Sequence, residues 1–176
     1  PMNMYFTTTR EHVERAGGIF HDCIIDEAHD PLSEHPFKGN VDLAKLQALV
    51  DREGAERIAY LSIAPCVNMA GGQPFSMANL REVAAWAGRH RLPIIFDATR
   101  ALENAYFIQQ REEGYRQRPV REILREMMGY GEGCTMSSKK DNLVNIGGFL
   151  ATNNAAFFEK AREMVVIFEG LHTYGG

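Results

Sequence analysis

PIIFDATR, the stretch at residues 93–100, decides how the rest of the sequence is interpreted. Its apolar half, Pro93–Phe96, predicts a buried strand that delivers Asp97 at its carboxyl end. Helical patterns separate this run from four similar ones, which predict further strands at Gly18–Ile25, Ile58–Ala64, Gly133–Met136 and Ile146–Ala151. The alternation predicts an α/β domain with a mainly parallel sheet and helices on both faces.

Apolar residues recur at helical spacing in four of the intervening segments. The first covers residues 43–52, where Gly54 is placed to end the helix, and the second begins after Ser76, a residue type that caps helix N-termini. The third surrounds Ile123. In the last, residues 155–168, the stripe predicts core positions at Phe157, Ala161, Met164, Val165 and Phe168.

The composition is that of a globular protein, since 45% of the 176 residues are hydrophobic and 24% are charged. Acidic and basic residues are mixed along the chain, and the net charge is -4, so no basic stripe is present to bind nucleic acid. No apolar run reaches the roughly 18 residues that span a bilayer, and the first residues lack a signal peptide's regions, which favours a cytoplasmic protein with no membrane partner. The odd number of cysteines, Cys23, Cys66 and Cys134, predicts reduced thiols.

Asp97 has three interpretations. It could cap a helix, with Arg100 at the surface. It could hold the metal of a nucleotide hydrolase, but that requires a glycine-rich loop ending in Gly-Lys-Ser or Gly-Lys-Thr, which the sequence lacks. It could pair with a protonated pyridine nitrogen, so that the ring accepts the electrons of a carbanion. The third interpretation requires a lysine at another strand end.

Such a lysine follows the predicted strand that ends at Met136, in the run SSKKD at residues 137–141. Lys140 lies 43 residues after Asp97, enough for a crossover helix to bring the two strand ends side by side. A lysine must lose its proton to form an imine, and the adjacent charge of Lys139 disfavours the protonated form of Lys140. Both amines attract a phosphate. The alternative is a pair of solvated lysines in a loop.

Other positions give weaker signals. Asn68 precedes the glycine-rich run at residues 70–74, which can bring backbone close to a ligand, and Phe6 is either a core ring or a stacking platform for a cofactor. The acidic and histidine residues at 21–30 are the best candidate for a metal site. Strand alternation would send His21 and Asp22 to opposite faces, so we interpret this run as a solvated loop edge.

Six runs, in order along the chain, resemble the β-eliminating lyase family of fold-type I pyridoxal-phosphate enzymes, the family of tyrosine phenol-lyase and tryptophanase. They are FKG (37–39), GGQP (71–74), SMANL (76–80), ENAYFI (103–108), KKD (139–141) and TYGG (173–176). The resemblance covers essentially the whole chain, whereas the family's chain is much longer. It implies that residues 1–176 are an internal part of the cofactor-binding large domain, without the N-terminal segment and the C-terminal small domain.

The resemblance implies pyridoxal 5'-phosphate as the cofactor. Lys140 would form the imine with its aldehyde, and Asp97 would pair with its ring nitrogen. Asn68 and Arg100 would hydrogen-bond its phenolic oxygen, and Phe6 would stack on its ring.

Further positions follow from the same resemblance. Ser137 and Lys139 would help to hold the cofactor phosphate. Asn145 matches a backbone-carbonyl ligand of an activating monovalent cation, usually potassium. Thr7 stands where the tryptophan-cleaving branch carries an acidic residue, and it would orient the phenol hydroxyl of a tyrosine substrate.

These matches favour cleavage of L-tyrosine to phenol, pyruvate and ammonium. The alternatives are cleavage of L-tryptophan to indole, another fold-type I enzyme, and a non-catalytic fragment. Departures from the family pattern at Pro65-Cys66, Ser138 and Leu171-His172 bear on the identity of the aromatic substrate. The groups that bind the substrate carboxylate are expected from absent segments and a neighbouring subunit, which implies a homodimer or homotetramer.

Overall fold

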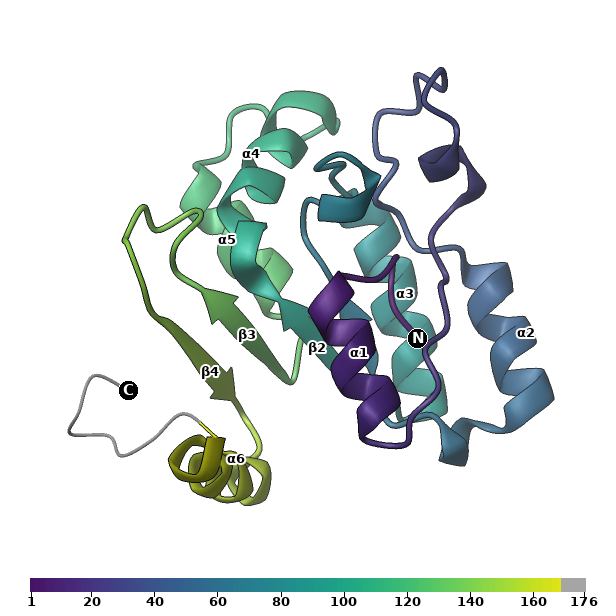
Figure 1. Cartoon of the computed structure of the whole chain (residues 1–176). Helices are drawn as coiled ribbons and strands as arrows, with labels where there is room; N and C mark the ends of the chain where they lie inside the picture. Colours follow the sequence, from purple (N-terminus) through teal and green to yellow (C-terminus); the bar gives the residue numbers. More distant parts are fainter. Residues whose placement is uncertain (169–176) are drawn as a thin grey trace.

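The computed structural model describes residues 1–168, which contain one four-stranded sheet in the order β1-β2-β3-β4. β1, β2 and β3 are parallel, and β4 runs antiparallel beside β3 (Figure 1). The mainly parallel α/β fold is therefore confirmed. Leu171, His172 and the run at 173–176 lie outside the described residues. The strands are β1 (Leu61–Ile63), β2 (Ile94–Asp97), β3 (Gly133–Ser137) and β4 (Gly148–Thr152).

The strand expected at Gly18–Ile25 was a wrong prediction. In this stretch the described residues make only isolated bridges, including one between Met2 and Asp22. The Asp22 carboxylate accepts hydrogen bonds from the backbone N–H groups of Met4 and Ile24, at 3.2 and 3.0 Å. Because a side chain satisfies these donors, the segment does not continue as a regular ladder.

Six α-helices accompany the sheet among the described residues, with four short 3₁₀ turns between them. The predicted helices are confirmed, and Ser76 caps its helix as expected, since its Oγ accepts a hydrogen bond from Asn79 N at 3.0 Å. Helices α1 and α4 had not been predicted. The helices are α1 (Thr7–Arg15), α2 (Leu43–Glu53), α3 (Met77–His90), α4 (Ala101–Arg111), α5 (Val120–Met128) and α6 (Ala155–Phe168), and the turns are η1 (Asp26–His29), η2 (Ala55–Arg57), η3 (Asn68–Ala70) and η4 (Ala98–Arg100).

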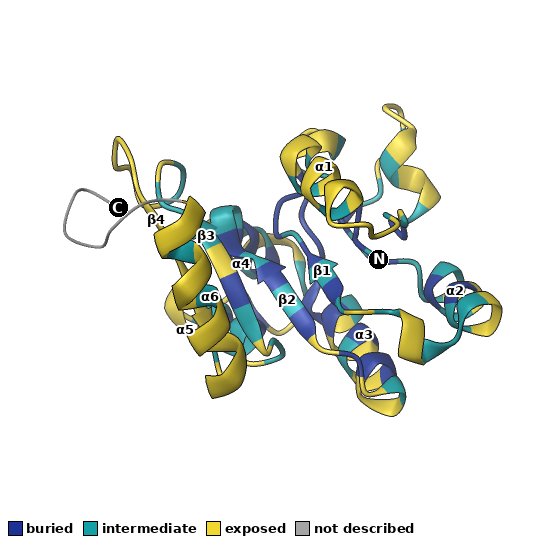
Figure 2. Ribbon diagram, turned by 60° about the horizontal axis from the view of Figure 1, so that its bottom comes forward, coloured by how far each residue is buried: buried dark blue, intermediate teal, exposed yellow. Residues whose placement is uncertain are grey.

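The core lies between the sheet and the helices that follow its parallel strands. Figure 2 places α1 and α3 on opposite sides of β1 and shows buried residues on β1 and β2. Phe96, Ile108, Ile123 and Met127 are fully buried in the main cluster. Cys23, Cys66 and Cys134 are buried and free, as predicted. No helix among residues 1–168 has the length and apolar character needed to cross a membrane.

The burial predicted for α6 is wrong for the described residues. Phe157, Met164 and Phe168 are 44%, 53% and 73% exposed, while Ala161 and Val165 are only partly buried. The helix lies beside β4, the exposed edge of the sheet (Figure 1). A helical stripe predicts which face is apolar, but it does not supply the surface that covers that face.

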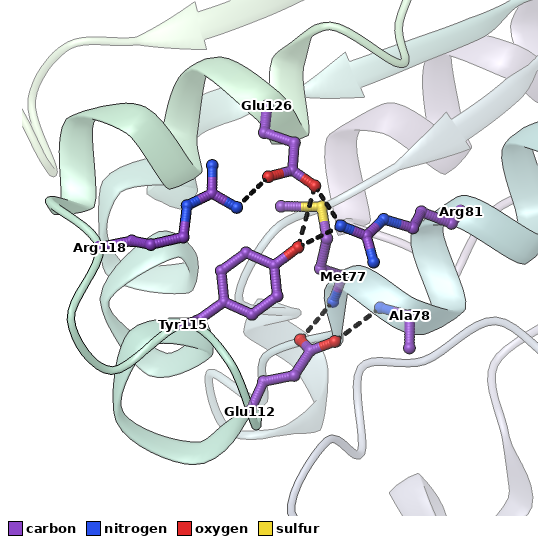
Figure 3. A network of polar contacts seen from close by, with 7 residues as sticks. All are labelled: Met77, Ala78, Arg81, Glu112, Tyr115, Arg118 and Glu126. Atoms are coloured by element: carbon purple, nitrogen blue, oxygen red, sulfur yellow. Dashed lines mark hydrogen bonds and ion pairs between the residues drawn. The ribbon is translucent and has the colours of Figure 1, made fainter.

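A polar network joins α3, α5 and the α4–α5 loop (Figure 3). The Glu126 carboxylate accepts hydrogen bonds from Arg81, Arg118 and the Tyr115 hydroxyl, at 2.5, 2.5 and 2.9 Å. Partial burial acts to raise the pKa of Glu126, but these donors outweigh it and hold that pKa below its usual value. Burial, and then the bond to Glu126, raises the pKa of Tyr115 to about 12.

A second carboxylate in the same region caps α3. The Glu112 oxygens accept hydrogen bonds from the backbone N–H groups of Met77 and Ala78, at 2.6 and 2.8 Å (Figure 3). These are donors of the first helical turn, which have no partner within the helix. The two carboxylates thereby attach the helices that follow β1 and β2 to each other.

Candidate active site

A cavity of about 550 Å³ opens at the carboxyl ends of β1, β2 and β3. This is the edge of an α/β sheet at which ligands bind, and the volume falls in the range of small-molecule sites. The structure brings six of the predicted site residues together in its lining: Phe6, Asn68, Asp97, Arg100, Ser137 and Lys140.

The loops after β2 and β3 are joined at the strand ends. Asp97 is the residue opposite Thr135 in the parallel pairing of β2 with β3. The chain then turns through η4, where the Thr99 hydroxyl accepts a hydrogen bond from Ser137 N at 3.2 Å. Parallel pairing and this bond bring residues distant in sequence to the same cavity.

Lys140 enters the cavity from the loop after β3. Its Nζ donates a hydrogen bond to Ser137 Oγ at 3.1 Å. Partial burial, followed by the charges of Lys139 and Arg100, lowers the pKa of Lys140, and the Asp97 carboxylate acts in the opposite direction. A lowered pKa increases the fraction of free amine, which is the form that attacks a carbonyl carbon.

The loops after β1 and β2 meet through Arg100 and Asn68. An Arg100 Nη donates a hydrogen bond to Asn68 Oδ1 at 3.1 Å, and the guanidinium lies 3.7 Å from the Glu103 carboxylate. Arg100 retains further N–H donors, because a guanidinium carries five. The pair therefore presents donors to an oxygen atom in the cavity.

Aromatic side chains supply the apolar part of the lining. Phe6, the residue before α1, is half-buried, and Phe149 of β4 lines the cavity as well. The backbone of Phe6 is extended and then turns into the helix at Thr7. A planar ligand would find an aromatic ring here on which to stack.

Three predicted site residues do not line this cavity. Thr7 is exposed at the first position of α1, although its neighbours Thr8 and Thr9 are in the lining. Lys139 and Asn145 are exposed in the segment between β3 and β4.

Cys66 is a potential nucleophile at the cavity wall, and its environment keeps it inert. Burial is the main cause that raises the pKa of its thiol, to about 12. The thiol is therefore uncharged at neutral pH and is not the reactive thiolate form. Lys140 in the same cavity differs, because its lowered pKa favours the uncharged amine.

Two carboxylates of the run at 21–30 make other contacts. The Asp22 carboxylate accepts backbone hydrogen bonds, and Asp26 forms an ion pair with Lys45 at 2.5 Å. Within residues 1–168, no group of three or more histidine, cysteine, aspartate or glutamate side chains is placed to hold a metal ion.

Sequence reasoning missed three residues that shape the cavity. Thr99 lies in the quoted DATR run, so its hydroxyl could have been considered with the strand end. Asn104 and Asp141 were part of the resemblance, but no local signal indicated their contacts. Asn104 is fully buried in α4 and bonds to Cys66 and Phe75, at either end of the loop that carries Asn68.

Comparison with known proteins assigns the family. The model of the β-eliminating lyase family matches residues 1–172. This chain belongs to the β-eliminating lyase family. The relatives include proteins named tyrosine phenol-lyase from Symbiobacterium sp. (strain SC-1), Nostoc punctiforme and Intrasporangium calvum, which are 67%, 65% and 64% identical over all 176 residues. Those residues span 38%, 38% and 37% of the relatives' own lengths.

Solved structures agree on the fold. A protein from Exiguobacterium sp. 255-15, described as an aromatic amino acid β-eliminating lyase or threonine aldolase, superposes with a TM-score of 0.54 at 22% identity. The match covers 73% of this chain and 31% of that one. A protein from Listeria monocytogenes EGD-E, described as an L-allo-threonine aldolase, superposes with a TM-score of 0.56 at 17% identity. That match covers 74% of this chain and 31% of the aldolase chain. At these identities the likeness concerns the fold alone.

Proposed function

We propose that the protein containing this chain is a pyridoxal-phosphate-dependent carbon–carbon lyase that cleaves L-tyrosine to phenol, pyruvate and ammonium. One observation carries the proposal: Lys140 and Asp97 line the same cavity, from the ends of neighbouring strands. Family membership and the tyrosine phenol-lyases among its relatives support it. Because the chain spans 38% of such a relative, we also propose that residues 1–176 are an internal part of the large domain.

The residues present fit pyridoxal phosphate. The cofactor's aldehyde requires an amine, its pyridine nitrogen a carboxylate, and its flat ring an aromatic neighbour. Lys140, Asp97 and Phe6 supply these groups around one cavity. Ser137 also lines the cavity. Together with Lys139, two residues later in the chain, Ser137 would hold the cofactor phosphate.

When bound, pyridoxal phosphate supplies a ring that accepts the electrons of the bond being broken. Asp97 would keep the ring nitrogen protonated by accepting its N–H. The Lys140 amine, with its lowered pKa, would remove the proton from the α-carbon of the substrate and hold it. Arg100 and Asn68, joined at 3.1 Å, would donate to the cofactor's phenolic oxygen and fix the ring in the cavity.

Substrate choice and assembly are further parts of the proposal. Thr7 would orient the phenol hydroxyl of L-tyrosine, and the Asn145 carbonyl would bind potassium. Thr7 lies one residue from Phe6 and Thr8, which both line the cavity. We expect the complete protein to act in the cytoplasm as a homodimer or homotetramer, which would supply the groups that bind the substrate carboxylate.

The decisive experiment uses the full-length protein and Lys140→Ala. Pyridoxal phosphate is added, the imine is reduced with borohydride, and peptides are mapped by mass spectrometry. We expect the cofactor mass on Lys140 and not on the adjacent Lys139, and neither visible absorbance nor activity in the variant. Phenol and pyruvate should form from L-tyrosine. Indole from L-tryptophan in place of phenol would assign the sister activity, and an unlabelled Lys140 would reject the proposal.

A further inference from the structure

Asp141 connects the lysine loop to the start of α4. Its Oδ2 accepts a hydrogen bond from Leu102 N at 2.7 Å and a longer one from Glu103 N at 3.4 Å. Helix α4 begins directly after η4, the turn that ends in Arg100. A single carboxylate therefore bonds the residue after Lys140 to the residues after Arg100.

The second oxygen of the Asp141 carboxylate is shielded from solvent, although the loop that follows is exposed. Asp141 Oδ1 is shielded from solvent and has no hydrogen-bond partner within the described residues. The residues that follow Asp141 are open to solvent, with Leu143 at 91% and Ile146 at 85% exposure. The later bonds of the loop, such as that from Ser138 N to Gly147 O at 2.9 Å, stay within the loop, whereas Asp141 bonds to α4.

Lys140 lies between two such attachments. On one side, Ser137 N donates to the Thr99 hydroxyl at 3.2 Å. On the other, Asp141 accepts from Leu102 N at the positive end of α4. Both attachments lead to the segment that follows β2, which begins directly after Asp97 and carries Arg100.

We propose that Asp141 is a positioning residue that fixes the Lys140 amine relative to Asp97 and Arg100. This inference rests on the proposed role of Lys140 and extends it to a residue that does not line the cavity. Its action is geometric, because an amine must lie within contact distance of the atom it attacks, and a displacement of about 1 Å costs on the order of a hundredfold in rate.

Charge is a weaker explanation. Burial, Lys139 and Arg100 lower the pKa of Lys140, and Asp97 raises it. The Lys140 amine bonds to Ser137 Oγ, whereas the Asp141 carboxylate bonds to Leu102 N. The Asp141 oxygen therefore points to the backbone of α4.

The test compares Asp141→Ala with Asp42→Ala in the full-length protein. Asp42 makes the same kind of cap on α2, since its Oδ1 accepts from Ala44 N at 2.8 Å and Lys45 N at 3.2 Å, and it is not in the cavity lining. Hydrogen exchange is first measured without cofactor. We expect faster exchange in residues 138–147 and at 102–103 for Asp141→Ala only.

The second readout is cofactor capture by Lys140. We expect Asp141→Ala to lower the rate of borohydride-trapped labelling on the order of tenfold or more, whereas Asp42→Ala keeps the wild-type rate. Equal exchange and equal trapping in these two variants would overturn the inference. If wild-type Lys140 is never labelled, the proposed function fails, but exchange still decides whether Asp141 holds the loop.

Two conservative variants separate geometry from charge and serve if the alanine variant does not fold. Asp141→Asn keeps the length of the side chain and an acceptor oxygen, whereas Asp141→Glu keeps the charge and adds one methylene. A positioning role predicts near wild-type trapping for the asparagine variant and impaired trapping for the glutamate variant. The opposite order would show that charge matters and would refute the positioning role.

Discussion

Removing the buried amide of Asn104 should destabilise the domain severely, because this side chain replaces missing backbone partners. Its Oδ1 accepts hydrogen bonds from Cys66 N and Phe75 N, both at 3.0 Å, and its Nδ2 donates to Phe75 O at 3.0 Å. Asn104 is completely buried. Asn104→Ala leaves three backbone groups unpaired at about 1 to 1.5 kcal/mol each, so we expect a loss of about 3 to 4.5 kcal/mol.

Urea unfolding of the full-length protein measures this loss, with Gln110→Ala as the matched control. Gln110 is an exposed amide on the same helix, and its removal should change the free energy of unfolding by no more than about 0.5 kcal/mol. Because residues 66–75 also carry Asn68, Asn104→Ala should bind pyridoxal phosphate more weakly. A loss for Asn104→Ala within about 1 kcal/mol of the control would refute the reasoning, because the backbone groups would then have found other partners.

Two further predictions concern packing and pH. In Gly39→Ala the new Cβ would lie 2.5 Å from the Gln73 carbonyl oxygen, so we expect the free energy of unfolding in urea to fall by about 1 to 3 kcal/mol. Gly88→Ala adds its methyl group in open space within α3, and it should raise the free energy of unfolding by about 0.5 to 1 kcal/mol. The reverse ranking of the two variants would contradict the packing. Glu126 has a lowered pKa when folded, so its stabilisation is complete above its unfolded pKa of about 4.3 and is lost as pH falls through the folded value. Glu126→Gln should therefore have a free energy of unfolding about 1 to 3 kcal/mol lower than wild type at pH 7, and the difference should shrink below about pH 4. A difference that stays constant with pH would show that the charge of Glu126 is not the cause.

The parallel strands could be predicted because their signals are local. Each is a short apolar run followed by a polar or glycine-containing loop, and Asp97 appears where β2 ends. Parallel pairing then requires that strand ends share one edge, which is why Asp97 and Lys140 could be placed in one site from sequence. The strand predicted at 18–25 failed because the Asp22 side chain bonds to the backbone in place of a neighbouring strand.

Helix α4 was missed because its buried face is mixed, with small apolar residues beside a polar one. Leu102 and Tyr106 are about half exposed, while the polar Asn104 is fully buried. Hydrophobic periodicity assumes that buried positions are apolar, so a helix with a buried amide gives a weak signal. The hydrogen bonds of Asp141 to α4 could not be predicted for another reason. The partners of Asp141 lie 38 and 39 residues earlier, and no local sequence pattern links them.

Helix α4 and polar attachments to it determine the geometry of the cavity. Asn104 holds the loop after β1, Asp141 holds the loop after β3, and Thr99 joins the loops after β2 and β3. Exposed residues of these loops, such as Asn68 and Lys139, gain little from apolar packing, although Val67 beside Asn68 is buried. Hydrogen bonds to α4 therefore fix the relative positions of the cavity residues, while the apolar core fixes the sheet. The sheet and the cavity depend on different residues. A change such as Asp141→Ala would therefore displace Lys140 and leave the core intact.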